Sequence, residues 1–483
     1  MSDILSLDAT GQLVALAGRR ISAYELLDAT RRRWEQVNGA INAVVNTDWD
    51  RAVERAKSID DHRVKGDTLG PLAGLPMTVK DTLDVEGMPA SSGVDVFRHG
   101  KRPDAAVVRH ARLAGAVIWG KTNTPVLAGD WQTYNALYGT TNNPWDLDRT
   151  CGGSSGGAAA ALAAKITALE IGSDIGGSLR VPASFCGVYA HKPTWGAVSQ
   201  IGHVPPRPGA HAERDLNVVG PMARSARDLR LLLSTLEHGP LAAKGQAVEL
   251  KGLKIGLWLD EPAFVLDPEV RSAIETFAEE LRLHGALMIP MPAPVDAPTL
   301  LTAYRTLLAG LLAEDLSASR LRALERSRGA AKLARALGAG PDSWAGVALA
   351  YTATHREWLA ADEVRARLGT QMRRVFTQLD VLMMPIAPVA AFPHDHRPFN
   401  RRTLRLSDGR KAPYLALARW IALATTCGLP ATAIPVGHTS EGLPVGVQLV
   451  GPRGGDSRTL AVAEAIEERL GGFVAPSLQT APS

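Results

Sequence analysis

Residues 151–194 read CGGSSGGAAAALAAKITALEIGSDIGGSLRVPASFCGVYAHKPT and hold two serine sites flanked by glycine. The first site contains Ser154 and Ser155, and the second ends at Ser178. An alanine-rich run between them predicts a helix, and the apolar run 166–171 predicts a buried strand. Glycine lets the backbone approach a ligand closely, and successive N–H groups in such a turn form a concavity that binds anions. A serine beside those donors is a candidate nucleophile for acyl transfer, because the tetrahedral intermediate places negative charge where the N–H groups point.

The composition of the chain is that of an ordinary globular protein. Its 483 residues are 46% hydrophobic and 21% charged, enough to bury a substantial core. The 53 basic and 49 acidic side chains leave a net charge of +4, which is too small to indicate a strong field toward nucleic acid or an anionic membrane. The apolar runs fall short of the roughly 20 residues that a membrane helix needs. We therefore expect neither a nucleic-acid partner nor a membrane partner.

Cysteine usage and the first residues indicate the compartment. Cys151, Cys186 and Cys427 are too few and too scattered for a disulfide framework or a zinc site, and they fit a reducing environment. The N-terminus carries Asp3 and Asp8 and lacks a basic region followed by an apolar one, so no signal peptide is expected. These features predict a cytoplasmic protein.

The first part of the chain predicts two helices and then a short apolar strand that ends in a lysine. Ser22 and Glu25 form a capping-box pattern that opens a helix through Val37, and a second helix is expected over 47–59. The segment 75–80 then predicts a short strand ending in Lys80. That lysine either reaches solvent at the strand end or is buried, where its ammonium must find partners or lose its proton.

The rest of the chain alternates between strands and helices. Asp104 is expected to cap a helix through Arg112, residues 120–150 to form loops that could line a pocket, and the Pro- and Gly-rich segment 200–214 to form a surface loop or lid. A strand–helix–strand pattern over 253–289 is typical of a parallel α/β sheet. The other elements expected are strands at 117–119, 381–384, 431–435 and 445–450, and helices at 224–236, 268–283 and 457–470.

No repeat or low-complexity linker divides the chain. We therefore expect a single domain over residues 1–483, with a core at about 20–470 and a helical insertion at about 296–380. The clustered arginines of that insertion predict a solvated helical layer.

Four interpretations of the glycine/serine region compete. The nucleotide-binding patterns G-x-x-x-x-G-K-[ST] and G-x-G-x-x-G are absent from it. The hydrolase pattern G-x-S-x-G occurs around both Ser154 and Ser155, but it must follow a strand, and 143–149 predicts a turn-rich loop. No lysine completes S-x-x-K. A purely structural glycine-rich turn is the remaining alternative.

Several motifs in a fixed order resemble the amidase signature family. The likeness covers about 20–470, weakest between 240 and 420, and departs at Ser173 and Ala190, where the family often has threonine and glycine. The matching segments are Gly-Leu-Pro-Met-Thr-Val-Lys-Asp at 74–81, Gly-Lys-Thr-Asn at 120–123, Gly-Gly-Ser-Ser-Gly-Gly at 152–157, Asp-Ile-Gly-Gly-Ser-Leu-Arg-Val-Pro-Ala at 174–183, Cys-Gly-Val at 186–188, Lys-Pro-Thr at 192–194, Gly-Pro-Met-Ala-Arg-Ser at 220–225 and Gly-Leu-Pro-Val-Gly-Val-Gln at 442–448.

The resemblance implies a fold and a set of roles. The fold is one large α/β domain with a mixed central β-sheet flanked by helices. Ser178 would be the nucleophile, Ser154 a bridging serine after a cis Gly153–Ser154 peptide, and Lys80 the base. Neither a metal nor a cofactor is implied. The oxyanion hole would be formed by the backbone N–H groups of Ile175, Gly176, Gly177 and Ser178.

A lysine base must be uncharged at the working pH. Lowering its pKa from about 10.4 to roughly 7–8 requires about 3–4 kcal/mol, which burial can supply. Asp81 follows Lys80 in the chain, but neighbouring residues on a strand point to opposite faces. By proximity alone Ser155 is as good a relay as Ser154, and only the resemblance separates them. Gly129, Asp130 and Ser155 are further candidates for substrate contact.

The remaining polar residues have simpler interpretations. Asp174 and Arg180 are expected to form an ion pair that shapes the serine turn. His191, His203 and His211 are expected on the surface or in packing roles. A metal site at 394–396 would lack a third ligand.

The function predicted is hydrolysis of the C–N bond of a small carboxamide, with anilides, esters or carbamates as further substrates that the resemblance implies. One alternative is the A subunit of a glutamyl-/aspartyl-tRNA amidotransferase. Its Tyr-Gly-Arg-Val run is replaced here by Trp-Gly-Ala-Val at 195–198, and its usual Ser-Leu-Asp sequence before Gly-Pro is missing at 215–220. A non-catalytic binding protein is the other alternative. The sequence leaves the oligomeric state open, and a homodimer is compatible with it.

Overall fold

The computed structural model describes residues 4–236, 247–340 and 343–478, so Asp3 lies outside it. One mixed sheet of 11 strands runs through the described chain, in the order β1-β3-β2-β8-β10-β9-β16-β17-β13-β11-β12. Its strands are β1 (Val44–Thr47), β2 (Pro76–Lys80), β3 (Val117–Thr122), β8 (Leu169–Asp174), β9 (Tyr189–Lys192), β10 (Val218–Ala223), β11 (Lys254–Leu257), β12 (Leu287–Pro290), β13 (Val381–Pro385), β16 (Ala431–His438) and β17 (Pro444–Val450). The expected α/β fold with a mixed central sheet is confirmed.

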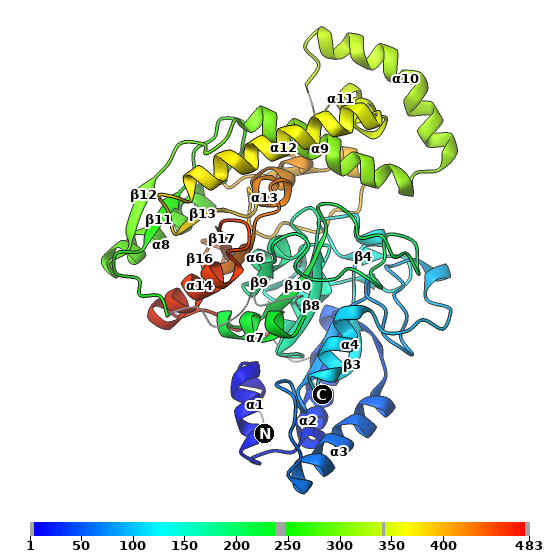
Figure 1. The fold of residues 1–483 in the computed structure, drawn as a ribbon, viewed down its shortest axis with the longest axis vertical. Helices are drawn as coiled ribbons and strands as arrows, with labels where there is room; N and C mark the ends of the chain where they lie inside the picture. Colours follow the sequence, from blue (N-terminus) through cyan, green and yellow to red (C-terminus); the bar gives the residue numbers. More distant parts are fainter. Residues whose placement is uncertain (1–3, 237–246, 341–342, 479–483) are drawn as a thin grey trace.

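Helices cover this sheet and extend beyond it at both ends of the molecule (Figure 1). They are α1 (Ala9–Ala17), α2 (Ala23–Ile41), α3 (Trp49–Lys65), α4 (Ala106–Leu113), α5 (Gly156–Ala163), α6 (Arg180–Cys186), α7 (Ala226–Leu236), α8 (Pro268–Leu283), α9 (Ala297–Leu312), α10 (Ala318–Ala336), α11 (Trp344–Tyr351), α12 (His355–Val375), α13 (Leu417–Thr426) and α14 (Asp456–Leu470). Within the described ranges, no helix combines the length and the apolar character needed to cross a bilayer.

The capping box at the start of α2 forms as predicted. The Ser22 hydroxyl accepts a hydrogen bond from the Glu25 N–H, and the Glu25 carboxylate accepts one from the Ser22 N–H. The second helix was predicted from residue 47, which is wrong. That residue ends β1, which pairs with β3, and α3 begins at Trp49 because Asp48 caps it.

The cap predicted at Asp104 is also wrong. Helix α4 begins at Ala106 and its N-cap residue makes no side-chain cap. The Asp104 carboxylate instead accepts a hydrogen bond from the Glu86 N–H at 2.8 Å and pairs with Arg112 at 3.1 Å. Its partners therefore lie in the preceding loop and at the far end of the helix.

The strand–helix–strand pattern over 253–289 folds as a parallel unit. Strands β11 and β12 pair in parallel, and α8 connects them. Strand β2 is likewise parallel to both β3 and β8, whereas β10 is antiparallel to β8 and to β9. Because β8 and β9 run in the same direction, the loops that follow them emerge at one edge of the sheet, together with the loop after β2.

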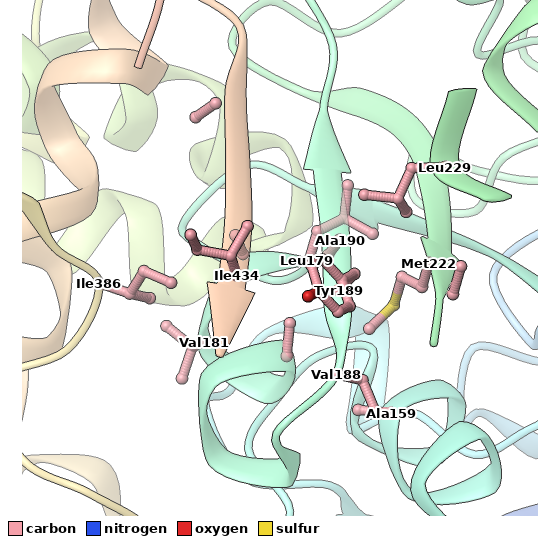
Figure 2. Packing of buried hydrophobic residues seen from close by; sticks show 14 of the residues in the cluster. Ala159, Leu179, Val181, Val188, Tyr189, Ala190, Met222, Leu229, Ile386 and Ile434 are labelled. Carbon is pink, nitrogen blue, oxygen red and sulfur yellow. The ribbon is translucent and has the colours of Figure 1, made fainter. Parts of the chain in front are cut away.

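The core beside this edge is apolar and closely packed. Leu179 precedes α6 and Val181 lies in its first turn. Their side chains lie near Tyr189 and Ala190 of β9 and Ile434 of β16 (Figure 2). All five side chains are at most 1% exposed. The turn that carries Ser178 therefore rests on a rigid support.

The segment between β12 and β13 is helical and contains α9 to α12. Figure 1 shows α10 and α11 as the part of this segment farthest from the sheet. The arginines of α10 that the sequence assigned to a solvated layer include Arg320, Arg322 and Arg326, all exposed.

Candidate functional site

The first serine turn joins a short strand to a buried helix. Strand β7 (Asp146–Thr150) pairs with β6 (Asn142–Asn143) in a two-stranded sheet, so the loop expected over 143–149 is wrong. Residues 151–155 then turn into α5, as the alanine run predicts. Position 157 accommodates only glycine, because a Cβ there would lie 2.4 Å from the Asn123 backbone nitrogen.

The second serine turn follows β8. That strand begins at Leu169 rather than at residue 166 and ends at Asp174. Gly177 has φ +91°, a conformation that glycine adopts freely. Ser178 comes next, 6% exposed, and its carbonyl accepts a hydrogen bond from the Ser155 N–H at 3.1 Å. This hydrogen bond joins the two serine turns directly.

Lys80 ends β2 and is fully buried beside these turns. Its Nζ lies 2.7 Å from the Ser154 Oγ and 3.1 Å from the Ser173 Oγ. The Gly153–Ser154 peptide is cis. Lys80 therefore does not reach solvent at the strand end, and of the two adjacent serines it contacts Ser154.

Burial changes the ionisation of Lys80. Desolvation lowers the pKa of its amine to about 7, although the carboxylates of Asp174 and Glu170 act in the opposite direction. Burial also raises the pKa of Glu170 to about 8, against the hydrogen bonds that Thr78 and Thr122 donate to it. A substantial fraction of Lys80 is thus uncharged near neutral pH.

The Ser155 hydroxyl hydrogen-bonds to the backbone of β8 rather than to the lysine. The hydroxyl oxygen lies 3.3 Å from the Ser173 carbonyl and 3.4 Å from the Ser173 N–H. The side chain is completely buried against the backbone of β8. These contacts are those of a packing residue, and the structure does not bring Ser155 to a surface that a substrate could reach.

One of the four expected oxyanion donors is already engaged. The Gly177 N–H donates to the Asp174 carboxylate at 2.9 Å. Among the described residues, the N–H groups of Ile175, Gly176 and Ser178 have no hydrogen-bond acceptor. An oxygen atom from a substrate could accept from these three groups.

The second turn is held by an ion pair, as expected. The Arg180 Nη2 lies 2.9 Å from the Asp174 Oδ1, and both side chains are fully buried. Burial alone would raise the pKa of Asp174, but the Arg180 guanidinium holds it at about 2. Arg180 also donates to the Ile421 carbonyl and to Gln448, which ties the turn to α13 and β17.

Comparison with known proteins places the chain in a family. A model of the amidase family matches residues 25–460. The chain belongs to the amidase family. The A subunit of glutamyl-tRNA(Gln) amidotransferase from Chloroflexus aurantiacus is 33% identical to it over 493 residues, covering 97% of each chain.

Solved structures share the fold of this chain. A 6-aminohexanoate cyclic dimer hydrolase, with 27% identity, superimposes with a TM-score of 0.78 over 96% of this chain and 97% of the other. The amidotransferase A subunit of Thermotoga maritima, with 25% identity, gives a TM-score of 0.70 over 95% of both chains.

The segment 129–132 of the amidase packs against the first serine turn. A Cβ on Gly153 would lie 2.6 Å from the Asp130 carbonyl. The Asp130 carboxylate pairs with Arg402 at 2.6 Å and accepts from the Tyr414 hydroxyl at 2.7 Å. Gly129 is exposed. Asp130 thus lies beside the site, with its charge neutralised by protein.

Two aromatic side chains flank the second turn of the amidase. The Trp131 indole N–H donates to the Gly176 carbonyl at 2.7 Å. The Tyr304 hydroxyl lies 3.4 Å from the Ile175 carbonyl. The sequence predicted only that the loops over 120–150, which include Trp131, could line a pocket. No sequence pattern singled out Tyr304, which comes from α9 in the helical segment.

The histidines singled out in the sequence lie in different environments. His191 is buried between Thr432 and Asp456, and His211 is exposed, as packing and surface roles predict. The rings of His394 and His396 lie 5.8 Å apart. His203, however, is buried next to Ser173 in the site, and no pattern in the sequence connects it to Lys80.

Proposed function

We propose that this protein hydrolyses a carboxamide through an acyl-enzyme on Ser178. The buried Lys80 amine, 2.7 Å from the Ser154 hydroxyl, carries the proposal. Uncharged Lys80 accepts the proton of Ser154, and Ser154 accepts that of Ser178 as its oxygen attacks the carbonyl carbon. The leaving amine is protonated along the same relay, and water then hydrolyses the ester.

The glycine turn supports this chemistry. The tetrahedral intermediate carries its charge on the former carbonyl oxygen, and the N–H groups of Ile175, Gly176 and Ser178 are available to it. Removing one such donor typically costs about 2.7–4 kcal/mol of transition-state stabilisation. The ion pair of Asp174 and Arg180 keeps the turn in the geometry that presents these groups.

The charges beside the site favour an uncharged acyl group. Asp130 is neutralised by Arg402, and Asp174 by Arg180. A charged substrate group in this region would need a partner of its own to offset its desolvation. Trp131, which is half-buried beside the turn, offers apolar ring surface that suits an aliphatic or aromatic acyl group.

The second candidate is the glutaminase subunit of a tRNA-dependent amidotransferase. Near-full-length relatives carrying that name are 31–34% identical to this chain, and this similarity gives the candidate more support than the sequence motifs alone suggest. It uses the same catalytic groups on glutamine, and its partners would include other subunits and tRNA. The differences at 195–198 and 215–220 weigh against it.

Two experiments separate these possibilities. A fluorophosphonate probe should label the wild-type chain at Ser178, located by mass spectrometry, and should not label Ser178→Ala; an unlabelled wild type would refute the acyl-enzyme and support a binding protein. The isolated chain is then assayed on primary amides, anilides, esters, carbamates and glutamine. Turnover of simple amides without partner subunits supports the first candidate, and turnover of glutamine alone supports the second.

A further inference from the structure

A chain of hydrogen bonds leads from Lys80 to a histidine in the loop after β9. The Lys80 Nζ lies 3.1 Å from the Ser173 Oγ, and that oxygen lies 2.9 Å from the His203 Nε2. The other ring nitrogen, Nδ1, lies 2.7 Å from the Pro205 carbonyl oxygen. Lys80 is completely buried, Ser173 is 2% exposed and His203 is 6% exposed.

The loop that carries His203 is anchored beside Lys80. His203 forms a β-bridge with Leu83, and the Val204 N–H donates to the Thr82 carbonyl at 2.7 Å. Gly202 accepts from the Asp84 N–H at 2.9 Å. The histidine is therefore held by the three residues that follow Lys80 and Asp81 in the chain, and its position relative to the lysine is tightly defined.

The direction of each hydrogen bond follows from the chemistry of its last acceptor. A carbonyl oxygen only accepts, so the His203 proton is on Nδ1 and Nε2 is the free acceptor. The Ser173 hydroxyl must then donate its single proton to Nε2. With that proton committed, the Ser173 oxygen can only accept from Lys80.

We infer that His203 is a positioning residue that, through Ser173, directs one Lys80 N–H away from the reacting groups and leaves the lysine lone pair facing Ser154. An uncharged amine has two N–H donors and one lone pair. If Ser173 could also donate, its proton would compete for that lone pair and block proton transfer from Ser154. This inference rests on the proposed function, and it adds to it a residue that never touches the substrate.

The charged groups around the chain agree with this arrangement. Burial lowers the pKa of His203 to about 3, the Pro205 carbonyl acts against that shift, and the charges of Lys80 and Arg214 add to it. Lys80 in turn faces Asp174 and Glu170 of β8. His203 is therefore a neutral imidazole throughout the range in which Lys80 titrates.

The test uses two variants that separate the two ring nitrogens. His203→Asn keeps a group near Nδ1, which can bond Pro205, but does not reach Ser173. His203→Gln places an amide near Nε2, where its oxygen can accept from Ser173. The readout is the second-order rate constant for fluorophosphonate labelling of Ser178, measured from pH 5 to pH 10, which needs no knowledge of the natural substrate.

We expect His203→Asn to lower the labelling rate at its high-pH plateau about 10-fold. The acid limb of the pH–rate profile, where labelling falls as Lys80 is protonated, should move to lower pH. The limb moves down because a freed Ser173 hydroxyl donates to the uncharged amine and stabilises it. His203→Gln should stay within about 3-fold of wild type. Ser173→Ala removes the competing hydroxyl itself, so His203→Asn should cause no further loss in that background. The double variant should label no more slowly than His203→Asn alone, because the histidine acts through the serine.

A merely structural histidine gives a different result. Loosened packing would admit water to Lys80, and the acid limb would move up toward the pKa of free lysine, about 10.4. Any one of three results would overturn the inference. The acid limb of His203→Asn could stay in place or move to higher pH, the effects of the two substitutions could add in the double variant, or His203→Asn and His203→Gln could label at equal rates. His191→Leu, which removes a buried histidine outside the site, is the matched control and should leave the limb in place. Wild-type labelling at Ser178 with any of these contrary results refutes the positioning role alone, whereas an unlabelled wild type refutes the proposed function.

Discussion

Lys121 pairs with Asp81, the residue that follows Lys80 in the chain. The Lys121 Nζ lies 3.2 Å from the Asp81 Oδ1, and both side chains are completely buried. Lys121 also donates to the carbonyl oxygens of Leu83 and Met88. The carboxylate nearest to Lys80 in sequence is thus neutralised by a different lysine, and the groups that oppose the lowered pKa of Lys80 are Asp174 and Glu170.

This pair predicts a large effect on stability. Lys121→Met should lower the free energy of unfolding by about 3–5 kcal/mol, because it leaves the Asp81 carboxylate buried without its partner. The double variant Asp81→Asn/Lys121→Met should lose less than the single one. Urea denaturation of each variant measures the difference. Arg31→Met, which breaks the exposed pair with Glu35, is the control and should change stability by about 0–1 kcal/mol; an equally small effect of Lys121→Met would contradict the prediction.

Lys80 predicts a specific pH dependence of activity. The amine must be uncharged to accept a proton, so kcat/KM should rise with pH and level off above about 7, the pKa that burial gives it. Lys80→Met should lower the rate at neutral pH by about 10²–10⁴-fold and abolish this acid limb. Steady-state kinetics on an active amide provide the measurement. A limb that persists in Lys80→Met would assign the titration to another group.

The same lysine should reduce stability. Its pKa is about 7 in the folded chain and about 10.4 when unfolded, so between these values the unfolded state binds more protons. Stability should therefore rise with pH across this window, and the penalty is fully present below pH 7. Lys80→Met removes the penalty and should stabilise the protein at pH 7 by about 1–4 kcal/mol. Burial also lowers the pKa of Lys121 and of Lys192. The difference between the wild-type and variant unfolding free energies, followed from pH 6 to pH 10, isolates Lys80 from these two lysines. A variant less stable than wild type at pH 7 would show that the buried amine does not destabilise the fold.

The two adjacent serines should behave differently. Ser154→Ala removes the hydroxyl in contact with Lys80 and should reduce kcat/KM by at least 100-fold, as expected for the loss of a proton relay. Ser155→Ala removes hydrogen bonds to the Ser173 backbone and should cost about 0.5–1.5 kcal/mol of stability, with an activity close to wild type. Paired kinetic and unfolding measurements compare them. The reverse ranking would move the relay to Ser155.

The parts of this protein that the sequence predicted depend on local patterns. The capping box of Ser22 and Glu25 spans four residues, and the alanine run of α5 has one plausible conformation, so both elements followed directly. Lys80 stood out because a charged residue ended an apolar strand. The choice between Ser154 and Ser155 needed the resemblance, because two adjacent serines look alike until the turn directs one of them to the lysine.

The parts that it did not predict depend on contacts between distant segments. His203 lies in a Pro- and Gly-rich loop, and it reaches Ser173 because the loop is anchored by the bridge to Leu83 and by backbone hydrogen bonds to Thr82 and Asp84. Asp104 was expected to cap α4 because it precedes the helix, but Glu86 and Arg112 offered competing partners. Tyr304 reaches Ile175 from a helix 129 positions away. None of these contacts has a periodicity or spacing that could reveal it.

Trp131 is predicted to support the oxyanion turn. Its indole N–H donates to the Gly176 carbonyl at 2.7 Å, and its ring packs against Tyr414 at 5.6 Å between centroids. Trp131→Phe keeps most of the ring and loses the hydrogen bond, so the turn should become less well ordered. We expect kcat to fall about 10-fold, corresponding to about 1.4 kcal/mol, with a smaller change in KM.

The matched control for Trp131→Phe is Trp145→Phe. Trp145 also donates its indole N–H to a backbone carbonyl, that of Cys186 at 3.0 Å, but at the far end of α6 from Ser178. It should lose a similar amount of stability while kcat stays within about 2-fold of wild type, since the hydrogen bond it loses, worth about 1 kcal/mol, does not hold the turn. If Trp131→Phe raised KM and left kcat unchanged, Trp131 would contribute to substrate binding alone. The loss of kcat is expected because the carbonyl that Trp131 holds belongs to Gly176, whose N–H is one of the proposed oxyanion donors.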